Sequence, residues 1–344
     1  MSSVRSGNTT GVRGAGRADD SLWGPIQALL DDPQTEEVWW NDPARIFYAV
    51  DGVTRLSNVV IAEAQAQAMV SAAVTASGRR LDTSHPFVDA QLPDGSRLHA
   101  VIPPIAQRFW AVNIRRYVVR PDSLADLVNR RVMTADVALI LDGAVAAGAN
   151  VLVSGGTHTG KTTVLNALLG ACHGQRVVSC EEIRELRLGH GDWVALQTRD
   201  AGLEGTGAVT LRDLVREALR MRPGRVVVGE VRGPESLDLL LAMNCGTPAA
   251  ATVHANSAED AVDRLTGLPL LAGPNISAGF VARSVGRCLD LIVHLGRTDS
   301  GRRVVEQIAT VSAGPDGPRV GRLFQWDGAG LVRSGAELPA RWCR

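Results

Sequence analysis

Eight consecutive residues match the phosphate-loop pattern G-x-x-x-x-G-K-T: Gly155-Gly156-Thr157-His158-Thr159-Gly160-Lys161-Thr162. An apolar run at residues 151–153 precedes them, and a helix-forming run at 164–169 follows. Strand, loop and helix in this order are the context in which the pattern binds nucleotide phosphates. The sequence therefore predicts a nucleoside-triphosphate site at this loop.

The residue types of the loop suit the charge of a triphosphate. Glycines let backbone N–H groups close around phosphate oxygens, Lys161 adds a positive charge, and the Thr162 hydroxyl reaches Mg²⁺. His158 is unusual, because a non-glycine residue is strained wherever the backbone needs a positive φ. We expect nucleotide contacts from the loop and the residue after it: Gly155, Gly156, Thr157, His158, Thr159, Gly160, Lys161, Thr162 and Thr163.

Composition limits the classes of function. The 344 residues are enough for two domains, and 45% hydrophobic with 21% charged residues is ordinary globular composition. The 36 basic and 36 acidic residues give a formal net charge of zero. No overall field then attracts the chain to nucleic acid, so we expect no direct nucleic-acid binding.

The five cysteines form no C-x-x-C pair, which argues against a zinc site and against a disulfide framework. We expect reduced thiols in a cytoplasmic protein, and no metal other than Mg²⁺. No uncharged apolar stretch reaches the ~18 residues that a membrane-spanning helix needs. Any membrane association is therefore expected to go through partners.

Changes in composition predict the domain organisation. Residues 1–20 are rich in Gly, Ser, Thr and Arg, which predicts a disordered tail. Strand patterns at 38–40, 46–50, 88–92 and 97–102, with helices near residue 22 and at 62–76, predict an α+β domain over 21–117. A polar, proline-broken stretch predicts a linker at 118–123, followed by a second domain over 124–344.

The second domain alternates strand and helix signals. A helix is expected at 135–147, and strands at 151–153, 176–179, 226–228 and 250–253. This alternation predicts an α/β fold with a parallel sheet whose ligand lies at the carboxyl edge.

Two of these apolar strands run into glutamates, Glu181 and Glu230. Both then lie on the edge that carries the phosphate loop, where carboxylates hold Mg²⁺ or orient the attacking water. We expect both to be catalytic, with Glu230 in the metal shell and Glu181 on the water, although the sequence leaves open which is the base. His254, which follows another strand, is a candidate donor to the γ-phosphate.

The segment 210–213 forms a capping box, and the helix after it carries Arg212, Arg216 and Arg220 on one face. Arginines at this spacing predict a solvated stripe or a subunit contact.

The motifs together resemble the secretion-superfamily ATPases, most closely the CpaF-like branch of Tad/Flp pilus assembly and related type II/type IV secretion. The resemblance spans about residues 22 to 310. It is carried by residues 214–223, 226–233 and 252–257, and in the N-terminal part by 30–33, 89–97, 102–104 and 114–116.

This resemblance implies a hexameric ring of subunits, each with a RecA-like C-terminal ATPase domain and a mobile N-terminal domain that closes over Mg-ATP. It makes Lys161 and Thr162 the Walker A residues, Glu230 the Walker B glutamate, Glu181 part of the acidic box and His254 the His-box histidine. It also assigns phosphate contacts to Arg97, Arg115 and Arg116. The implied location is cytoplasmic, held at the membrane through inner-membrane platform proteins.

Two alternatives to a secretion or pilus-assembly motor remain. One is a conjugative-type DNA-export ATPase. The other is a nucleotide-binding scaffold with little turnover, favoured by His158 and by the short approach to the His box at 245–251, which lacks the family's first histidine.

Overall fold

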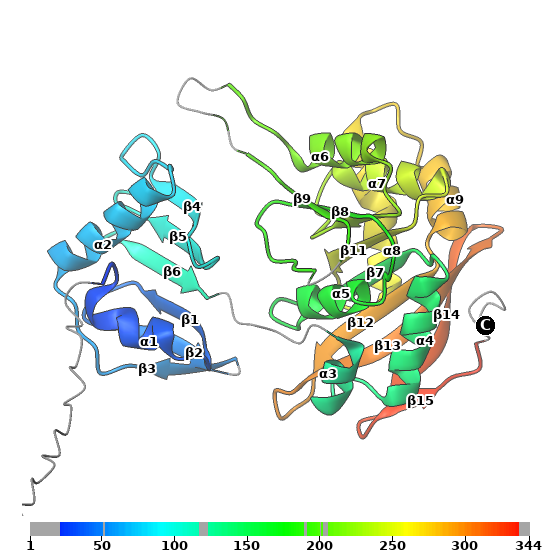
Figure 1. Ribbon diagram of the computed structural model, residues 1–344, viewed down its shortest axis with the longest axis horizontal. Coiled ribbons are helices and arrows are strands. Elements are labelled where there is room, and N and C mark those ends of the chain that lie inside the picture. The colour runs from blue at the N-terminus through cyan, green and yellow to red at the C-terminus, as the bar shows by residue number, and fades with distance from the viewer. Residues whose placement is uncertain are drawn as a thin grey trace, which may run out of the picture. The chain divides into compact units, whose positions relative to one another are not determined.

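The computed structural model describes residues 21–50, 52–116, 123–188, 191–199, 201 and 206–336. The chain divides into two compact units, residues 1–118 and 119–344 (Figure 1). The predicted tail at 1–20 lies outside the described residues, as does all of the predicted linker except Ser123.

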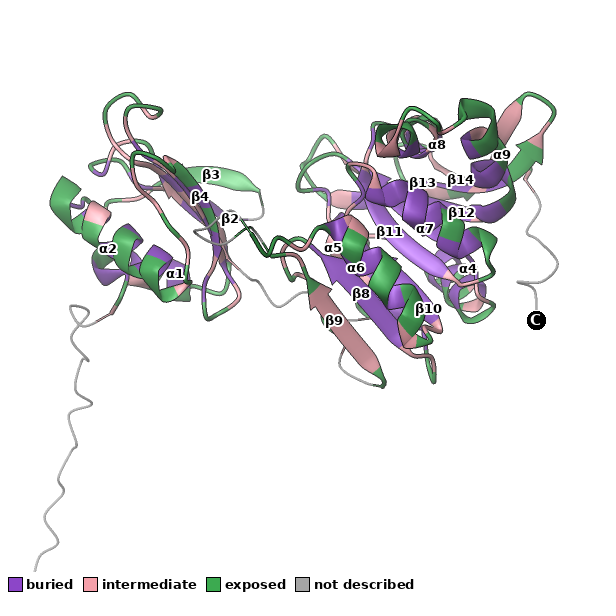
Figure 2. Cartoon of the chain, turned by 90° about the horizontal axis from the view of Figure 1, so that it is seen from above, coloured by how far each residue is buried: buried purple, intermediate pink, exposed green. Residues whose placement is uncertain are grey.

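The N-terminal unit is a six-stranded antiparallel sheet with order β3-β2-β1-β6-β5-β4. Its helices α1 and α2 pack on one face (Figure 2). There Met69 and Val70 are buried with alternate strand residues such as Leu98 and Ile114. This period of two produces one buried and one open face. The elements are η1 (Gly24–Ile26), α1 (Gln27–Asp31), β1 (Thr35–Trp40), β2 (Phe47–Val50), β3 (Val53–Leu56), α2 (Glu63–Ala76), β4 (Phe87–Gln91), β5 (Arg97–Val101) and β6 (Ala111–Arg115).

Strand β6 was not predicted from the sequence. It lies in the middle of the sheet, between β1 and β5, and pairs Arg115 with both Glu37 and Arg97. The sequence signal is weak because the strand is short and leads directly into the polar segment. Only Val112 and Ile114 show the alternation of a buried face.

The C-terminal unit is an α/β layer structure built on a nine-stranded sheet of order β15-β14-β13-β12-β7-β11-β10-β8-β9. Helices α3 to α5 pack on one face of the sheet and α6 to α9 on the other. The elements are α3 (Leu124–Asn129), α4 (Ala135–Ala146), β7 (Val151–Gly155), α5 (Lys161–Leu169), β8 (Val177–Glu181), β9 (Trp193–Gln197), α6 (Leu211–Ala218), η2 (Leu219–Met221), β10 (Arg225–Val228), α7 (Glu235–Asn244), β11 (Ala249–His254), α8 (Ala258–Gly267), η3 (Leu268–Ala272), α9 (Ala278–Cys288), β12 (Leu291–Arg297), β13 (Arg303–Gly314), β14 (Gly317–Trp326) and β15 (Leu331–Arg333).

The predicted parallel sheet is confirmed: its four strands are β7, β8, β10 and β11, and β9 and β12 add parallel neighbours at its two sides. Three strands that the sequence did not predict, β13, β14 and β15, extend the sheet in antiparallel pairs. Short turns such as the one from Gly314 to Gly317 join these strands, and turns of this length permit only antiparallel neighbours.

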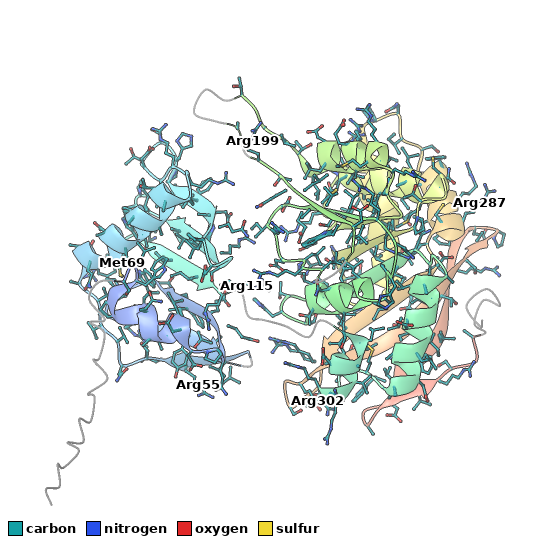
Figure 3. The ribbon with its side chains drawn as sticks, in the orientation of Figure 1. Arg55, Met69, Arg115, Arg199, Arg287 and Arg302 are labelled. Atoms are coloured by element: carbon teal, nitrogen blue, oxygen red, sulfur yellow. The ribbon has the colours of Figure 1, made fainter. Side chains whose placement is uncertain are left out.

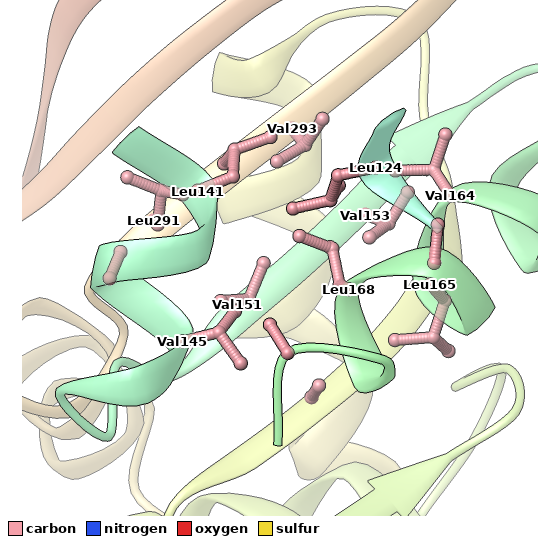
Figure 4. Packing of buried hydrophobic residues seen from close by; sticks show 14 of the residues in the cluster. Leu124, Leu141, Val145, Val151, Val153, Val164, Leu165, Leu168, Leu291 and Val293 are labelled. Atoms are coloured by element: carbon pink, nitrogen blue, oxygen red, sulfur yellow. The ribbon is translucent and has the colours of Figure 1, made fainter. Parts of the chain in front are cut away.

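Strand β7 is the central strand that leads into the phosphate loop, and all five of its residues are buried. Val151 and Val153 pack on one side against Leu165 and Leu168 of α5 and Leu141 of α4 (Figure 4). This packing fixes the strand that carries the loop. Within the described residues, no helix combines the length and apolarity needed to cross a membrane.

Two of the three arginines in the predicted stripe, Arg212 and Arg216, contact helix α7, and the third, Arg220, is exposed beside Glu217. Arg212 Nε donates to Asp238 Oδ2 at 2.6 Å, and Arg216 Nε donates to Asp238 Oδ1 at 2.9 Å. Asp238 lies on α7 and is 6% exposed. Arg212 and Arg216 therefore link α6 to α7, since a nearly buried carboxylate requires such partners.

A buried arginine lies at the edge of the sheet opposite the phosphate loop. Arg225, at the start of β10, is fully buried and donates to the carbonyl oxygens of Val145 and Ala149, both at 2.9 Å. Val145 lies in the last turn of α4, and its carbonyl oxygen also accepts from the N–H of Gly148 at 3.0 Å. Burial is the main reason why the pKa of Arg225 is lowered.

We expect Arg225→Ala to lower the free energy of unfolding by about 3 kcal/mol, because it leaves a cavity and removes two buried hydrogen bonds to carbonyl groups. Arg176→Ala is the matched control, since Arg176 pairs with Asp192 at the surface. Its effect should stay below about 1 kcal/mol. Denaturant unfolding of both variants measures the difference, and equal losses would contradict a structural role for Arg225.

Candidate functional site

The phosphate loop takes the backbone shape that its sequence predicts. Gly160 has φ 98° directly before α5, and His158 has φ 58°. A Cβ at Gly155 would lie 2.6 Å from the Leu295 carbonyl oxygen, so only glycine fits there. The expected strain at His158 is present, because a side chain at positive φ is unfavourable.

Lys161 opens α5 and is 8% exposed. Its Nζ donates to the Gly156 carbonyl at 2.8 Å and to His254 Nδ1 at 3.3 Å. His254 reaches this position because β11 lies beside β7, in a register that pairs His254 with Gly155. The lysine thus bridges the loop and His254.

Glu230 lies two residues beyond β10 on the same edge of the sheet. Its Oε2 accepts a hydrogen bond from Arg232 Nη2 at 2.8 Å, and its Oε1 lies 3.0 Å from His254 Nε2. Burial alone would raise the pKa of Glu230, but the Arg232 hydrogen bond and the charges of Arg232, His254 and Lys161 outweigh it and lower the pKa. Glu230 is therefore held as a carboxylate.

His254 is held mainly in its neutral form. Burial and the nearby Lys161 charge lower its pKa, and Glu230 only partly opposes them. A neutral imidazole that accepts from Lys161 at Nδ1 carries its proton at Nε2, on the side of Glu230. The three side chains form a continuous polar row, Lys161, His254 and Glu230.

Glu181 ends β8 in a different environment. It is 2% exposed, and its Oε1 accepts hydrogen bonds from the N–H groups of Glu185 and Leu186, both at 2.9 Å. Burial raises the pKa of Glu181 to about 7, although these two hydrogen bonds oppose the shift. Its side chain packs against Gly229, where an added Cβ would lie 3.0 Å from Glu181 Cγ. The two predicted acids are thereby brought to neighbouring positions.

The oxygen atoms at this edge suit a magnesium ion better than a softer metal. Glu181 Oε2 is buried and has no hydrogen-bond partner among the described residues. Glu230 Oε1 is buried beside His254 Nε2, at 3.0 Å. The same part of the chain has no cluster of three His, Cys, Asp or Glu side chains able to hold a metal alone. Mg²⁺ is usually held by one or two protein oxygens together with phosphate oxygens, and these residues fit that pattern.

Sequence reasoning missed three arginines beside the loop: Arg232, Arg297 and Arg303. Arg232 lies within residues 226–233, and its position two residues after Glu230 was the available signal. Arg297 and Arg303 each donate to the His158 carbonyl at 3.0 Å, over a sequence separation of more than one hundred residues. No local pattern marks such contacts.

The three N-terminal arginines lie together in their own unit. Arg97 donates to Asp89 Oδ1 through Nε at 3.0 Å and Nη2 at 2.8 Å, and it lies opposite Arg115 across β5 and β6. Arg116 donates to the carbonyl oxygens of Asp32 and Thr35. Figure 3 shows Arg115 at the end of its strand. Their contact with nucleotide stays a prediction.

We expect the stability of the protein to report the raised pKa of Glu181. The folded chain keeps this proton up to about pH 7, whereas the unfolded chain releases it near pH 4.5, so ionisation lowers stability as pH rises through this window. Glu181→Gln cannot ionise, and its amide oxygen still accepts from Glu185 and Leu186. The variant should gain up to about 3 kcal/mol over the parent above pH 7, and little near pH 4.5.

Unfolding measured at pH 5 and pH 8 tests this. Glu182→Gln removes a charge at an exposed neighbouring carboxylate and is the control. A difference between Glu181→Gln and the parent that does not grow with pH would contradict the assigned environment.

Comparison with known proteins places the chain in a family. Residues 23–307 match the model of the family described as type II/IV secretion system protein. A Mycobacterium tuberculosis protein named for conjugal transfer is 37% identical, with 84% of each chain covered. The conjugal transfer protein TrbB of Rhizobium radiobacter is 32% identical, covering 85% of this chain and 88% of that protein. The type IV secretion system protein PtlH of Bordetella pertussis is 31% identical, covering 82% and 93%.

Solved structures share the fold. The ATPase DotB of Legionella pneumophila is 17% identical with a TM-score of 0.58, over 85% of this chain and 80% of that one. The pilus retraction motor PilT, solved with bound ADP, is 17% identical with a TM-score of 0.55, over 90% and 82%. The predicted fold class, an N-terminal domain followed by a RecA-like ATPase domain, is confirmed. The chain therefore belongs to the type II/IV secretion system protein family and is one of its ATPases.

Proposed function

We propose that the chain binds Mg-ATP at its phosphate loop and couples hydrolysis to domain motion in a hexameric ring that drives secretion or Tad/Flp-type pilus assembly. The observation that carries this proposal is the convergence of Lys161, His254, Glu230 and Glu181 on one edge of the sheet. These residues come from α5 and from the ends of three different strands. Such a convergence beside a phosphate loop suits phosphoryl transfer to water.

Lys161 is the residue that would bind the β- and γ-phosphates. In the structure its ammonium is held by the Gly156 carbonyl and by His254, both neutral acceptors. A phosphate oxygen is a stronger acceptor for this donor, because the hydrogen bond is then charge-assisted on both sides. Lys161 is also the only lysine in the sequence, so every other basic residue is an arginine.

The two glutamates would have different roles, one as the general base and the other as a ligand of Mg²⁺. Glu181 has a pKa of about 7, and its Oε2 has no partner in the described part of the chain, so it suits a general base that takes a proton from the attacking water. Glu230 is held ionised and, with the Thr162 hydroxyl, would hold Mg²⁺. When bound, the metal would neutralise charge on the phosphate oxygens. His254 would donate from Nε2 to the γ-phosphate or to Glu230.

Completion of the site would come from the N-terminal unit. Lys161 alone leaves most of the triphosphate charge uncompensated, and Arg97, Arg115 and Arg116 would add positive charge when that unit closes over the nucleotide. The hexameric ring and the inner-membrane platform partners are proposed from the family resemblance. In this proposal the motor works at the cytoplasmic side of a membrane.

A second candidate is a DNA-export ATPase of the conjugative type. The names of the M. tuberculosis and R. radiobacter relatives favour it, since both refer to conjugal transfer. The zero formal net charge favours the first candidate. DNA affinity that falls steeply with added salt would support the DNA-export role, because such a slope reports phosphate contacts.

We expect Lys161→Ala to reduce ATP turnover by on the order of 10²-fold or more, because the lysine charge acts on the transition state. Lys161→Arg should also lose most activity, since a planar guanidinium does not replace a compact ammonium in a closed loop. Phosphate release by the purified full chain measures both. The exposed pair residue Arg220, changed to Ala, is the control. Parent-like turnover in Lys161→Ala would overturn the proposed site.

A further inference from the structure

Two arginines of the β12–β13 hairpin bind the tip of the phosphate loop. Arg297 Nη2 and Arg303 Nε each donate to the carbonyl oxygen of His158, both at 3.0 Å. Arg297 is the last residue of β12 and Arg303 the first of β13, and the register places them directly opposite each other. Both side chains are half-buried.

Like charges directly opposite on adjacent strands destabilise a sheet, so Arg297 and Arg303 require a compensating interaction. The His158 carbonyl oxygen, which both arginines share as an acceptor, provides it. A carbonyl oxygen that accepts from two guanidinium groups forms two charge-assisted hydrogen bonds, which are stronger than neutral ones. The hairpin thus directs two positive charges at one atom of the loop.

The atom they hold controls the direction of the next N–H group. In a trans peptide the carbonyl of His158 and the N–H of Thr159 point in opposite directions. With the carbonyl fixed on the hairpin side, the Thr159 N–H is turned away from the hairpin. The positive φ of 58° at His158 is part of this conformation. Successive N–H groups aimed at one point form the anion-binding concavity of such loops.

We propose that Arg297 and Arg303 are positioning residues of the nucleotide site, which set nucleotide affinity by holding the His158 carbonyl and so aiming the Thr159 N–H at the phosphates. The inference rests on the proposed phosphate-loop function. In this role neither guanidinium needs to touch the nucleotide. The antiparallel extension of the sheet, which the sequence did not predict, then acts as a support for the loop.

This role gives a specific kinetic pattern. The Thr159 N–H serves ground state and transition state alike, so its loss raises KM and leaves kcat at saturating ATP unchanged. ADP and ATP binding should weaken by the same factor. Since the two donors share one acceptor, each single variant keeps one hydrogen bond. The double variant should therefore lose more than the product of the two single losses.

The experiment compares Arg297→Ala, Arg303→Ala and the double variant with a matched double variant, Arg302→Ala with Arg319→Ala. Arg302 lies in the turn of the same hairpin (Figure 3), with its guanidinium 5.9 Å from the Trp326 ring centroid. Arg319 is exposed on β14. The control removes the same charge from the same sheet extension. Fluorescent ADP and ATP analogues report Kd, phosphate release reports KM and kcat, and thermal unfolding reports the fold.

We expect a few-fold weaker binding in each single variant and at least about tenfold in the double variant, with kcat and unfolding temperature near those of the control. Nucleotide binding equal to the control would overturn the inference, as would a lower kcat with unchanged KM. If the double variant unfolds, the Kd, KM and kcat of the two single variants test the inference in the same way. A parent chain that binds no nucleotide would refute the proposed function itself, and this inference with it.

Discussion

The phosphate loop depends on its own backbone shape, which must present several N–H groups to one anion. Three features of the chain hold that shape. The buried strand β7 fixes the start of the loop, Gly155 accommodates the close Leu295 carbonyl, and α5 begins directly after the left-handed Gly160. The strain at His158 is compensated by two arginine hydrogen bonds to its carbonyl. Backbone strain of this kind persists only where the surroundings determine it.

The chemistry at the loop follows from two carboxylates in opposite environments. Burial raises the pKa of Glu181 to about 7 against the hydrogen bonds of two N–H groups. Glu230 lies among Arg232, His254 and Lys161, which lower its pKa and keep it ionised. Groups whose environments push their pKa values apart are suited to separate acid–base roles. The same sheet edge thus provides a base, a permanent carboxylate and an ammonium, each from a different element.

Local patterns predicted much of this architecture. The phosphate loop, the acid-terminated strands β8 and β10 and the capping box at Thr210 all depend on residues a few positions apart, and the structure contains each of them. The contacts that the sequence did not reveal join distant segments. Arg212 and Arg216 reach Asp238 more than twenty residues away, and Arg303 reaches His158 across 145 residues. Strand β6 and the antiparallel strands after β12 depend on sheet register, which the local pattern does not encode.

Selective chemistry at Lys161 tests the central claim most directly, because it is the only lysine in the chain. An amine-acylating reagent then reports on this one side chain, with the α-amino group of the chain as an internal reference. Mass spectrometry measures the rate of modification with and without Mg-ATP. The account predicts that Mg-ATP and ADP slow acylation of Lys161 while the α-amino group reacts at an unchanged rate. Equal rates at Lys161 with and without saturating nucleotide would contradict a phosphate contact by this residue.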